Sequence, residues 1–338
     1  MNRLAGNVAV VLGAAGSGNM GQAIARRFAQ EGARVVVGGR HEEALGALAA
    51  EIHGRHAVCD ITRKRDVEGL AQTALDAWGR IDIAVNCAGW GLMAKLHDTT
   101  EEQIDKLMDL QFKGVFFFLQ VFAERLAACG GGSIMTMSSA SVYALLYNHA
   151  AYIGTKAGAD ALVRCFANEY GARGVKVNAI APGLTATPMT EREMQMPGLE
   201  EVFLKEYPLG RLGTSQDVAD AALWLASAES FITGQVLQAN GGLTLRRNPL
   251  PREINASLAA AERLRSTAEP SLIHIAVADV HRLADGVHAP LLEGMDRGFH
   301  LIFGPRAQPD VHPFLCEQLN DGAADPSGGA GDDRLLSP

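Results

Sequence analysis

Cysteines are scarce in this sequence, and their spacing excludes two kinds of site. Five occur among 338 residues, and none forms a Cys-x-x-Cys pair: Cys59, Cys87, Cys129, Cys165 and Cys316. An odd number of widely separated thiols predicts neither a disulfide framework nor a zinc site. We therefore expect no bound metal, and we expect the protein to work in a reducing cytoplasm.

Clusters of basic residues and long apolar runs are missing as well. The formal net charge is -8, and no basic block offers a surface for the phosphates of a nucleic acid. No stretch approaches the roughly 18 apolar residues of a membrane-spanning helix. With 48% hydrophobic and 20% charged residues, the composition is that of a globular protein. We expect a small-molecule ligand, with neither a nucleic acid nor a membrane as partner.

Short apolar runs alternate with helical patterns for about 240 residues. The runs predict strands at Val8–Leu12, Arg34–Val37, His56–Val58, Ile81–Val85, Ser133–Met137, Val175–Ile180 and Gln235–Gln238. Helical patterns lie near residues 21–31, 42–51, 66–78, 101–128, 151–172 and 216–227. This alternation predicts an α/β fold with a doubly wound, Rossmann-type parallel sheet and a C-terminal appendage. Ligands of such sheets bind at the carboxyl ends of the strands.

The chain changes character after Arg247. Asn248-Pro249-Leu250-Pro251 predicts a linker, which a helix near 252–265 and a strand at Leu272–Val277 follow. The end of the chain is rich in Gly, Asp, Ser and Pro, which predicts disorder. We therefore divide the chain into a catalytic domain, 1–247, an extension of unknown role, 248–320, and a disordered tail, 321–338. Five histidines of the extension are predicted to be surface or packing residues rather than metal ligands: His274, His281, His288, His300 and His312.

One segment, from Ser139 to Lys156, concentrates the reactive side chains. Tyr152 and Lys156 are four residues apart, so on a helix they share a face. A phenol with a pKa of about 10 is a poor acid–base group at neutral pH, but a neighbouring ammonium favours the phenolate and lowers that pKa. Ser139 ends a predicted strand and could donate a hydrogen bond to a substrate carbonyl. The three residues predict a catalytic group.

Five motifs in order make residues 5–245 resemble the short-chain dehydrogenase/reductase family. They are Ser139, Tyr152-x-x-x-Lys156, Asn86-Cys87-Ala88-Gly89, Pro182-Gly183-Leu184-Thr185-Ala186-Thr187 and Asn240-Gly241-Gly242. The resemblance implies that Tyr152 exchanges a proton with the substrate oxygen while hydride moves between the substrate carbon and NAD(P). Lys156 then also binds the nicotinamide ribose. The resemblance places these further residues against the cofactor: Asn86, Ala88, Gly89, Pro182, Gly183, Thr185 and Thr187.

The sequence departs from the family at residue 111. The family usually has an asparagine there, which holds a water in the proton relay. The local pattern here is Gln111-Phe112-Lys113-Gly114-Val115-Phe116. Gln111 carries the same amide on a longer stem, so it either holds that water or leaves the relay impaired.

The glycine-rich loop between Gly13 and Gly21 also departs from the family pattern. The family's glycines fall at offsets that are Ser17 and Asn19 here, because the loop has two extra residues. The segment from Gly16 nevertheless satisfies Gly-x-Gly-x-x-Gly between a strand and a helix. Peptide N–H groups and a helix N-terminus attract a pyrophosphate. We predict that the pyrophosphate binds at this loop, with Gly18 as the preferred central contact, among Gly13, Ser17, Gly18, Asn19, Met20 and Gly21.

The end of the second strand predicts the choice of cofactor. An acidic residue there binds the ribose 2′-hydroxyl of NAD and repels a 2′-phosphate. Gly39 occupies that position and Arg40 follows, which favours NADP; the alternative is NAD with Arg40 lying over the adenine. By resemblance, Asp60 and Ile61 contact the adenine, although Asp60 could instead be a helix N-cap.

We therefore expect an NADP-preferring alcohol dehydrogenase or ketoreductase with an apolar or aromatic substrate. Five apolar residues could line its pocket or simply pack a helix: Met189, Met194, Met196, Leu199 and Phe203. Two alternatives stay open, a reductase of 3-oxoacyl thioesters on a carrier protein and a catalytically weakened dinucleotide-binding sensor. The resemblance also implies a homodimer or homotetramer that pairs the helices near 101–128 and 151–172.

Overall fold

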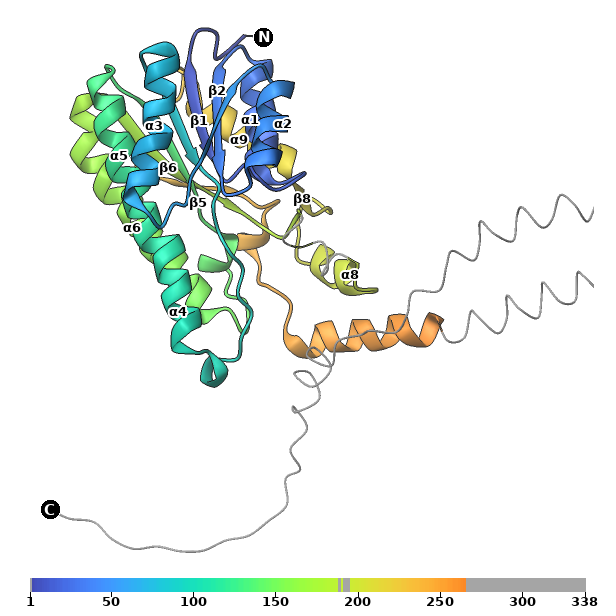
Figure 1. Cartoon of the computed structure of the whole chain (residues 1–338). Helices are drawn as coiled ribbons and strands as arrows, with labels where there is room; N and C mark the ends of the chain where they lie inside the picture. Colours follow the sequence, from blue (N-terminus) through green and yellow to red (C-terminus); the bar gives the residue numbers. More distant parts are fainter. Residues whose placement is uncertain (1, 188–189, 191–194, 266–338) are drawn as a thin grey trace, which may run out of the picture. The chain divides into compact units, whose positions relative to one another are not determined.

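Seven strands lie side by side in one parallel sheet (Figure 1). Their order is β3 (Arg55–Val58), β2 (Arg34–Gly39), β1 (Val8–Leu12), β4 (Ile83–Asn86), β5 (Gly132–Met137), β6 (Val175–Pro182) and β9 (Val236–Ala239). A second sheet pairs β7 (Thr185–Ala186) with β8 (Gly213–Thr214). The computed structural model describes residues 2–187, 190 and 195–265. Because the order runs outward from β1 on one side and from β4 on the other, the predicted doubly wound Rossmann-type fold is confirmed.

Helices cover both faces of the large sheet (Figure 1). One face carries α3 (Lys64–Trp78), α5 (Gly114–Ala128) and α6 (Ala150–Tyr170); the other carries α1 (Met20–Gln30), α2 (Glu42–Glu51) and α9 (Ser215–Ala226). Side chains of β1 alternate between the two apolar cores, since Val10 packs toward α3 and α5 while Val11 packs toward α1 and α9. Burial on both faces explains why the strand is a continuous apolar run.

The helix predicted over 101–128 is interrupted. The structure has α4 (Glu101–Leu107), a π-helical segment (Met108–Lys113) and then α5. The Gly114 N–H donates to the carbonyl of Asp109, five residues earlier, which widens this turn. The widened turn contains Gln111, whose buried amide binds other elements of the fold. Such π-helical turns are frequent at functional sites.

The predicted linker at 248–251 is part of the packed structure instead. Asn248 and Pro249 are buried, and residues 251–265 are helical. The compact unit runs from Met1 to Ala261 and so includes the first residues of the extension; a second unit begins at Glu262. The strand predicted at 272–277, the five histidines of the extension and the tail at 321–338 lie outside the described residues.

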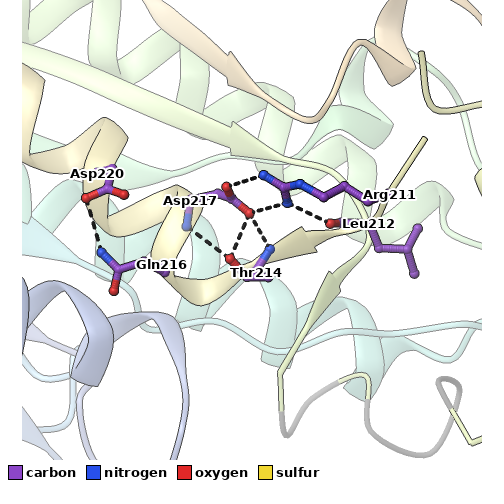
Figure 2. Close-up of polar contacts among 6 residues, drawn as sticks. All are labelled: Arg211, Leu212, Thr214, Gln216, Asp217 and Asp220. Atoms are coloured by element: carbon purple, nitrogen blue, oxygen red, sulfur yellow. Dashed lines mark hydrogen bonds and ion pairs between the residues drawn. The ribbon is translucent and has the colours of Figure 1, made fainter. Parts of the chain in front are cut away.

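A polar network fixes the start of α9 (Figure 2). The Thr214 hydroxyl accepts from the Asp217 N–H at 3.2 Å, and the Asp217 carboxylate accepts from the Thr214 N–H at 2.8 Å, which forms a capping box. Arg211 donates two hydrogen bonds of 2.7 Å to that carboxylate and thereby holds the pKa of Asp217 well below its usual range. The next residue, Ser215, donates to the carbonyl of Gly18 at 3.2 Å. The network therefore sets the N-terminus of α9 beside the glycine-rich loop.

Candidate active site

Two glycines fix the path of the loop between β1 and α1. Gly13 has a φ of +91°, and a Cβ there would lie 2.5 Å from the carbonyl carbon of Cys87. A Cβ on Gly21 would lie 2.5 Å from the carbonyl oxygen of Gly13. No side chain fits at either position, so the loop lies directly on the backbone that follows β4. The two extra residues of the loop leave both close contacts in place.

Asn19 closes the loop and caps α1. Its Oδ1 accepts from the Gln22 N–H at 2.9 Å, and its Nδ2 donates to the Gly13 carbonyl at 2.9 Å. The N–H of Gly18 is used inside the loop, where it donates to Gln22 Oε1 at 3.2 Å. Asn19 and Met20 line the neighbouring cleft, whereas Ser17 and Gly18 do not. For the pyrophosphate, the geometry thus favours the N-terminus of α1 over Gly18, the contact preferred from the sequence.

A cleft of about 730 Å³ lies at the carboxyl ends of β1, β2, β3 and β4, within the size range of small-molecule sites. Ten predicted cofactor contacts line it: Gly13, Asn19, Met20, Gly21, Arg40, Asp60, Ile61, Ala88, Gly89 and Thr187. The remaining predicted contacts lie outside its lining: Ser17, Gly18, Asn86, Tyr152, Lys156, Pro182, Gly183 and Thr185. Sequence reasoning missed the side chains contributed by α4 and the π-helical turn, among them Glu102, Asp105, Lys106 and Asp109.

The end of β2 has no room for a side chain at the position that would be acidic in an NAD site. A Cβ on Gly39 would lie 2.8 Å from the Cβ of Ala15 in the glycine-rich loop. Arg40 lines the cleft and makes no hydrogen bond or ion pair with any residue that the structure describes. The cleft therefore presents a cation and no carboxylate at the end of this strand.

Asp60, at the end of β3, forms a local turn rather than the alternative helix cap. Its Oδ1 accepts from the Thr62 N–H at 3.0 Å and from the Thr62 hydroxyl at 2.8 Å, while the N-cap of α3 is Arg63. Burial raises the pKa of Asp60, but the Thr62 hydrogen bonds and the charges of Arg40 and Arg63 together hold that pKa below its usual value. The carboxylate thus stays ionised near Arg40.

Ser139 and Tyr152 come together although they lie on different elements. Ser139 follows β5 and caps a short 3₁₀ turn, where its Oγ lies 2.8 Å from Ser141 Oγ. Tyr152 is in the first turn of α6. Burial raises the pKa of Tyr152, and hydrogen bonding with the Ser139 hydroxyl acts in the opposite direction. That Ser139 donates a hydrogen bond to a substrate carbonyl stays a prediction.

Lys156 is buried behind Tyr152. Its Nζ donates to the carbonyl of Met137 at 2.7 Å and lies 5.7 Å from the centroid of the Tyr152 ring. A Cβ on Gly89 would lie 3.8 Å from the same Nζ, so the ammonium lies against the turn after β4. Burial lowers the pKa of Lys156 to about 8, against the opposing charge of Asp160. Lowering of the Tyr152 pKa by this ammonium stays a prediction.

Gln111 connects three parts of the site. Its Nε2 donates to Thr155 Oγ1 at 3.1 Å, and its Oε1 accepts from the Trp90 N–H at 3.4 Å. Thr155 Oγ1 in turn donates to the carbonyl of Tyr152 at 2.9 Å. The glutamine is 1% exposed, so its amide is committed to these contacts. It can thus position the first turn of α6; that it holds a relay water stays a prediction.

Comparisons with known proteins agree with this site. A family model described as Enoyl-(Acyl carrier protein) reductase matches residues 13–244. The 3-oxoacyl-[acyl-carrier-protein] reductase of Thermotoga maritima is 36% identical over 251 residues, which cover 72% of this chain and 100% of that protein. The 7alpha-hydroxysteroid dehydrogenase of Escherichia coli is 36% identical over 71% of this chain and 95% of its own length. This chain belongs to the short-chain dehydrogenase/reductase family.

A solved member of this family shares the fold. The gluconate 5-dehydrogenase from Burkholderia cenocepacia, in complex with NADP and tartrate, is 30% identical, and the match covers 72% of this chain and 98% of that one with a TM-score of 0.69. As a short-chain dehydrogenase/reductase, the protein is an NAD(P)-dependent oxidoreductase of carbonyl and alcohol groups.

The cleft fits the dinucleotide of this family. Phosphates bind at exposed peptide N–H groups, at helix N-termini and beside cations. The cleft offers the glycine backbone at Gly13 and Gly21, the N-terminus of α1 and the guanidinium of Arg40. The nicotinamide, when bound, supplies or accepts the hydride. Across residues 2–187, 190 and 195–265, the structure holds no grouping of three His, Cys, Asp or Glu side chains fit for a metal ion. No helix within these same ranges is long and apolar enough to cross a membrane.

The family's Pro-Gly segment leads from β6 toward the cleft. A Cβ on Gly183 would collide with the hydroxyl of Tyr207, and that hydroxyl accepts from the Leu184 N–H at 2.6 Å. The Thr185 hydroxyl donates to the Gly183 carbonyl at 3.0 Å, so this threonine is occupied inside the turn. Within the segment, Thr187 reaches the cleft lining. Pro182 ends β6 behind these residues.

A buried carboxylate, missed from the sequence, lies one helical turn beyond Lys156. Asp160 is 6% exposed, its Oδ2 accepts from the Ser138 hydroxyl at 2.8 Å, and its Oδ1 is buried. Burial raises the pKa of Asp160, while Ser138 and the charges of Lys156 and Arg164 lower it. The position of Asp160 four residues after Lys156 could have predicted that the two side chains lie close together, because residues at that spacing share a helix face.

We expect the charge of Asp160 to help keep Lys156 protonated. Asp160→Asn removes the opposing charge, so the pKa of Lys156 falls below about 8 and dinucleotide affinity declines at lower pH than in the unmodified protein. The shift should be up to about one pH unit. Fluorescence titration with NADPH across the pH range measures it. Ser138→Ala, which removes the hydrogen bond but keeps the carboxyl group, is the control and should shift the pH dependence of affinity less than Asp160→Asn. An identical decline of NADPH affinity at high pH in Asp160→Asn and the unmodified protein would contradict the assignment.

Proposed function

We propose that this protein is an NADP-preferring ketoreductase, or an alcohol dehydrogenase of the matching alcohols, that acts on an apolar or aromatic substrate. The observation that carries the cofactor preference is the end of β2. Gly39 packs against Ala15, which leaves no space for an acidic side chain, and Arg40 lines the cleft and forms no hydrogen bond or ion pair with a described residue. A guanidinium binds a phosphate through paired donors, so Arg40 is suited to a 2′-phosphate.

In the proposed mechanism, Tyr152 exchanges a proton with the substrate oxygen and Ser139 donates a hydrogen bond to it. The hydrogen-bonding effect of Ser139 on the pKa of Tyr152 supports a shared role for the two hydroxyl groups. Lys156 supplies a positive charge behind the phenol and reaches toward the turn at Gly89, where the ribose is expected. Gln111 acts as a positioning residue, because it holds α6 through Thr155.

The substrate preference is proposed from the apolar rim beside Ser139. Large apolar side chains are exposed on the loops at 90–98 and 143–149: Met93, Leu96, Tyr143, Leu145 and Tyr147. The two loops are joined, since the Ala94 N–H donates to the Asn148 carbonyl at 2.8 Å. An exposed apolar rim favours ligands with apolar surface over sugars.

The cofactor proposal predicts a selective loss in Arg40→Ala. Removing a charge-assisted contact to the 2′-phosphate should raise the KM for NADPH by about tenfold or more and leave the KM for NADH nearly unchanged. Steady-state rates with both dinucleotides measure the two constants. Arg63→Ala is the matched control, because Arg63 also acts on Asp60 but does not line the cleft. Equal changes for NADPH and NADH in Arg40→Ala would argue against the proposal.

A substrate panel tests the activity itself. Initial rates should be measured with NADPH and NADH in parallel on aliphatic ketones, aromatic ketones, sugars and the corresponding alcohols. We expect turnover of apolar or aromatic ketones with NADPH above all others. Tight dinucleotide binding without turnover of any compound would favour the sensor alternative instead.

A second candidate is reduction of 3-oxoacyl thioesters on a carrier protein. It is favoured by the likeness to the 3-oxoacyl-[acyl-carrier-protein] reductase of Thermotoga maritima. Of the two basic residues that would face an acidic carrier, Arg173 is engaged with Glu124 at 3.1 Å, and Arg125 is exposed. A much higher rate on carrier-bound than on free substrate would select this candidate.

We also propose a homodimer or homotetramer that buries the outer face of α5 and α6. Phe116 is 37% exposed on α5, and its ring lies 5.5 Å from that of Phe166 on α6, which stacks at 5.9 Å on Tyr170. An aromatic cluster shared by two helices is a suitable centre for an interface between copies. Light scattering of the purified protein measures the mass, and a monomer would contradict the proposal.

A further inference from the structure

The chain beyond β9 is attached to the loop that follows Ser139. Asn248 is buried, and its Nδ2 donates to the carbonyl of Ala144 at 2.5 Å. Ala144 belongs to a small apolar cluster, separate from the two cores of the sheet, which also contains Ala140, the residue after Ser139. A residue of the C-terminal extension thus holds the backbone of the loop that begins at the predicted carbonyl-binding serine.

The same extension is attached to α8 (Leu199–Leu204). Ser257 Oγ donates to the carbonyl of Gly198 at 2.6 Å, directly before the helix. Gly198 has a φ of +83°, and a Cβ there would lie 2.7 Å from the carbonyl oxygen of Ser257, so the two backbones are in close contact. Ile254 and Leu258 pack against the apolar cluster that buries Leu199, Val202 and Phe203. One face of the helical segment at 251–261 therefore packs on α8.

Two arginines complete the attachment at the other end of α8. Arg246 donates to the carbonyl of Lys205 at 2.5 Å. Arg247 lies 3.5 Å from Glu206 and forms a 2.8 Å ion pair with Glu253. This pair and the Leu250 N–H, which donates to the same carboxylate, lower the pKa of Glu253 to about 2. Both ends of α8 are consequently bound by residues that follow β9.

The position of α8 depends on these contacts because the helix is short. A helix of six residues makes too few internal hydrogen bonds to be stable alone, so tertiary packing determines where it lies. Of the five residues that could line a pocket, Leu199 and Phe203 are buried in the apolar cluster and Met196 packs against it, while Met189 and Met194 lie outside the described residues. Leu146, from the loop after Ser139, packs against the same cluster.

We propose that residues 246–258, here called the strap, act as a specificity element of the active site. The strap holds α8 and the loop at 140–146 in one arrangement, so that the apolar wall beside Ser139 is already formed before a substrate arrives. Compounds that fit this wall bind without rearrangement. Bulkier apolar ketones require α8 to move and bind less tightly. This inference rests on the proposed ketoreductase function and assigns the extension a role within it.

The test loosens the strap in the full-length protein. Ile254→Ala/Leu258→Ala removes its apolar contacts, and Ser257→Ala removes the hydrogen bond to Gly198. Arg252→Ala, an exposed change on the same helix, is the matched control. Hydrogen exchange of the backbone amides of Leu199–Leu204 should become about tenfold faster in the first two proteins and stay unchanged in the control, while amides of α6 keep their protection.

The second measurement compares two apolar ketones, one small and one bulky, with NADPH. Loosening the strap should raise the ratio of kcat/KM for the bulky over the small ketone by about tenfold, chiefly through KM, and Arg252→Ala should leave it unchanged. If the double variant fails to fold, Ser257→Ala carries both measurements.

The two measurements separate the strap from the proposed function. Unchanged exchange across α8 would overturn the attachment, whatever the activity. Faster exchange with an unchanged selectivity ratio would overturn the specificity role. Absence of turnover in the unmodified protein would overturn the ketoreductase proposal and with it the specificity role, while exchange across α8 would still decide the attachment.

Discussion

Replacing Tyr152 with Phe should lower kcat/KM by about 10³-fold and leave the Kd for the dinucleotide within about twofold of its original value. The phenol is the group in the first turn of α6 that interacts with Ser139, and Phe keeps the ring while it removes the exchangeable proton. Because Tyr152 lies outside the lining of the dinucleotide cleft, the ring change should not disturb the pyrophosphate region. Steady-state kinetics and fluorescence titration with NADPH measure the two effects.

Tyr170→Phe is the matched control for this prediction. It makes the same chemical change at the other end of α6, where the Tyr170 hydroxyl donates to Glu124 at 2.6 Å. It should retain most of the activity, since this phenol is engaged with Glu124 and not with Ser139. Full activity in Tyr152→Phe would rule out the assigned mechanism, and an equal loss in both variants would point to a general disturbance of α6.

The proximity of Tyr152 and Lys156 could be predicted from the sequence because it depends on local geometry. Tyr152 and Lys156 share a face of one helix, and that relation follows from a spacing of four residues. The strands could be predicted for a similar reason. A strand that is buried on both faces of a sheet is a continuous apolar run in the sequence, as Val8–Leu12 is. The same spacing could have identified Asp160, because it repeats the interval from Tyr152 to Lys156.

Features that depend on contacts between distant segments could not be predicted from the sequence. The π-helical turn at Met108–Lys113 exists together with the bonds of Gln111 to Thr155 and Trp90, which belong to other elements. The Pro-rich segment at 248–251 has the composition of a linker, yet it is buried because Asn248 finds the carbonyl of Ala144. Composition predicts the intrinsic preference of a segment, and it carries no information about a partner more than one hundred residues away.

The glycine-rich loop could be predicted from the sequence in part. The pattern Gly-x-Gly-x-x-Gly located the loop, but because of the two extra residues it did not show which glycines are essential. The structure separates them by their surroundings. Gly13 would place a Cβ against the backbone of Cys87, whereas a Cβ on Gly18 would meet nothing within 4 Å. Gly13 and Gly18 both have a positive φ, of +91° and +70° respectively, so both favour glycine for their backbone conformation. They differ only in the room that surrounds a Cβ atom.

Gly13→Ala should therefore destabilise the protein far more than Gly18→Ala. Each substitution costs about 1–2 kcal/mol for the left-handed backbone. At Gly13 the overlap with the Cys87 carbonyl carbon at 2.5 Å also forces β1 and the turn after β4 apart, and such overpacking adds about 1–3 kcal/mol. That displacement opens the floor of the cleft, so NADPH binding should be lost in Gly13→Ala and nearly retained in Gly18→Ala, which does not line the cleft.

Denaturant unfolding and NADPH titration of the two variants decide this point together. A Gly18→Ala protein that loses dinucleotide affinity while keeping its stability would restore Gly18 as the pyrophosphate contact. Retained affinity in that variant, combined with loss in Gly13→Ala, leaves the phosphates with the N-terminus of α1, where Asn19 already holds the Gly13 carbonyl. In that case the extra residues lengthen the loop at its solvent side, because the contacts that bring β1, α1 and the turn after β4 together all lie at its two ends.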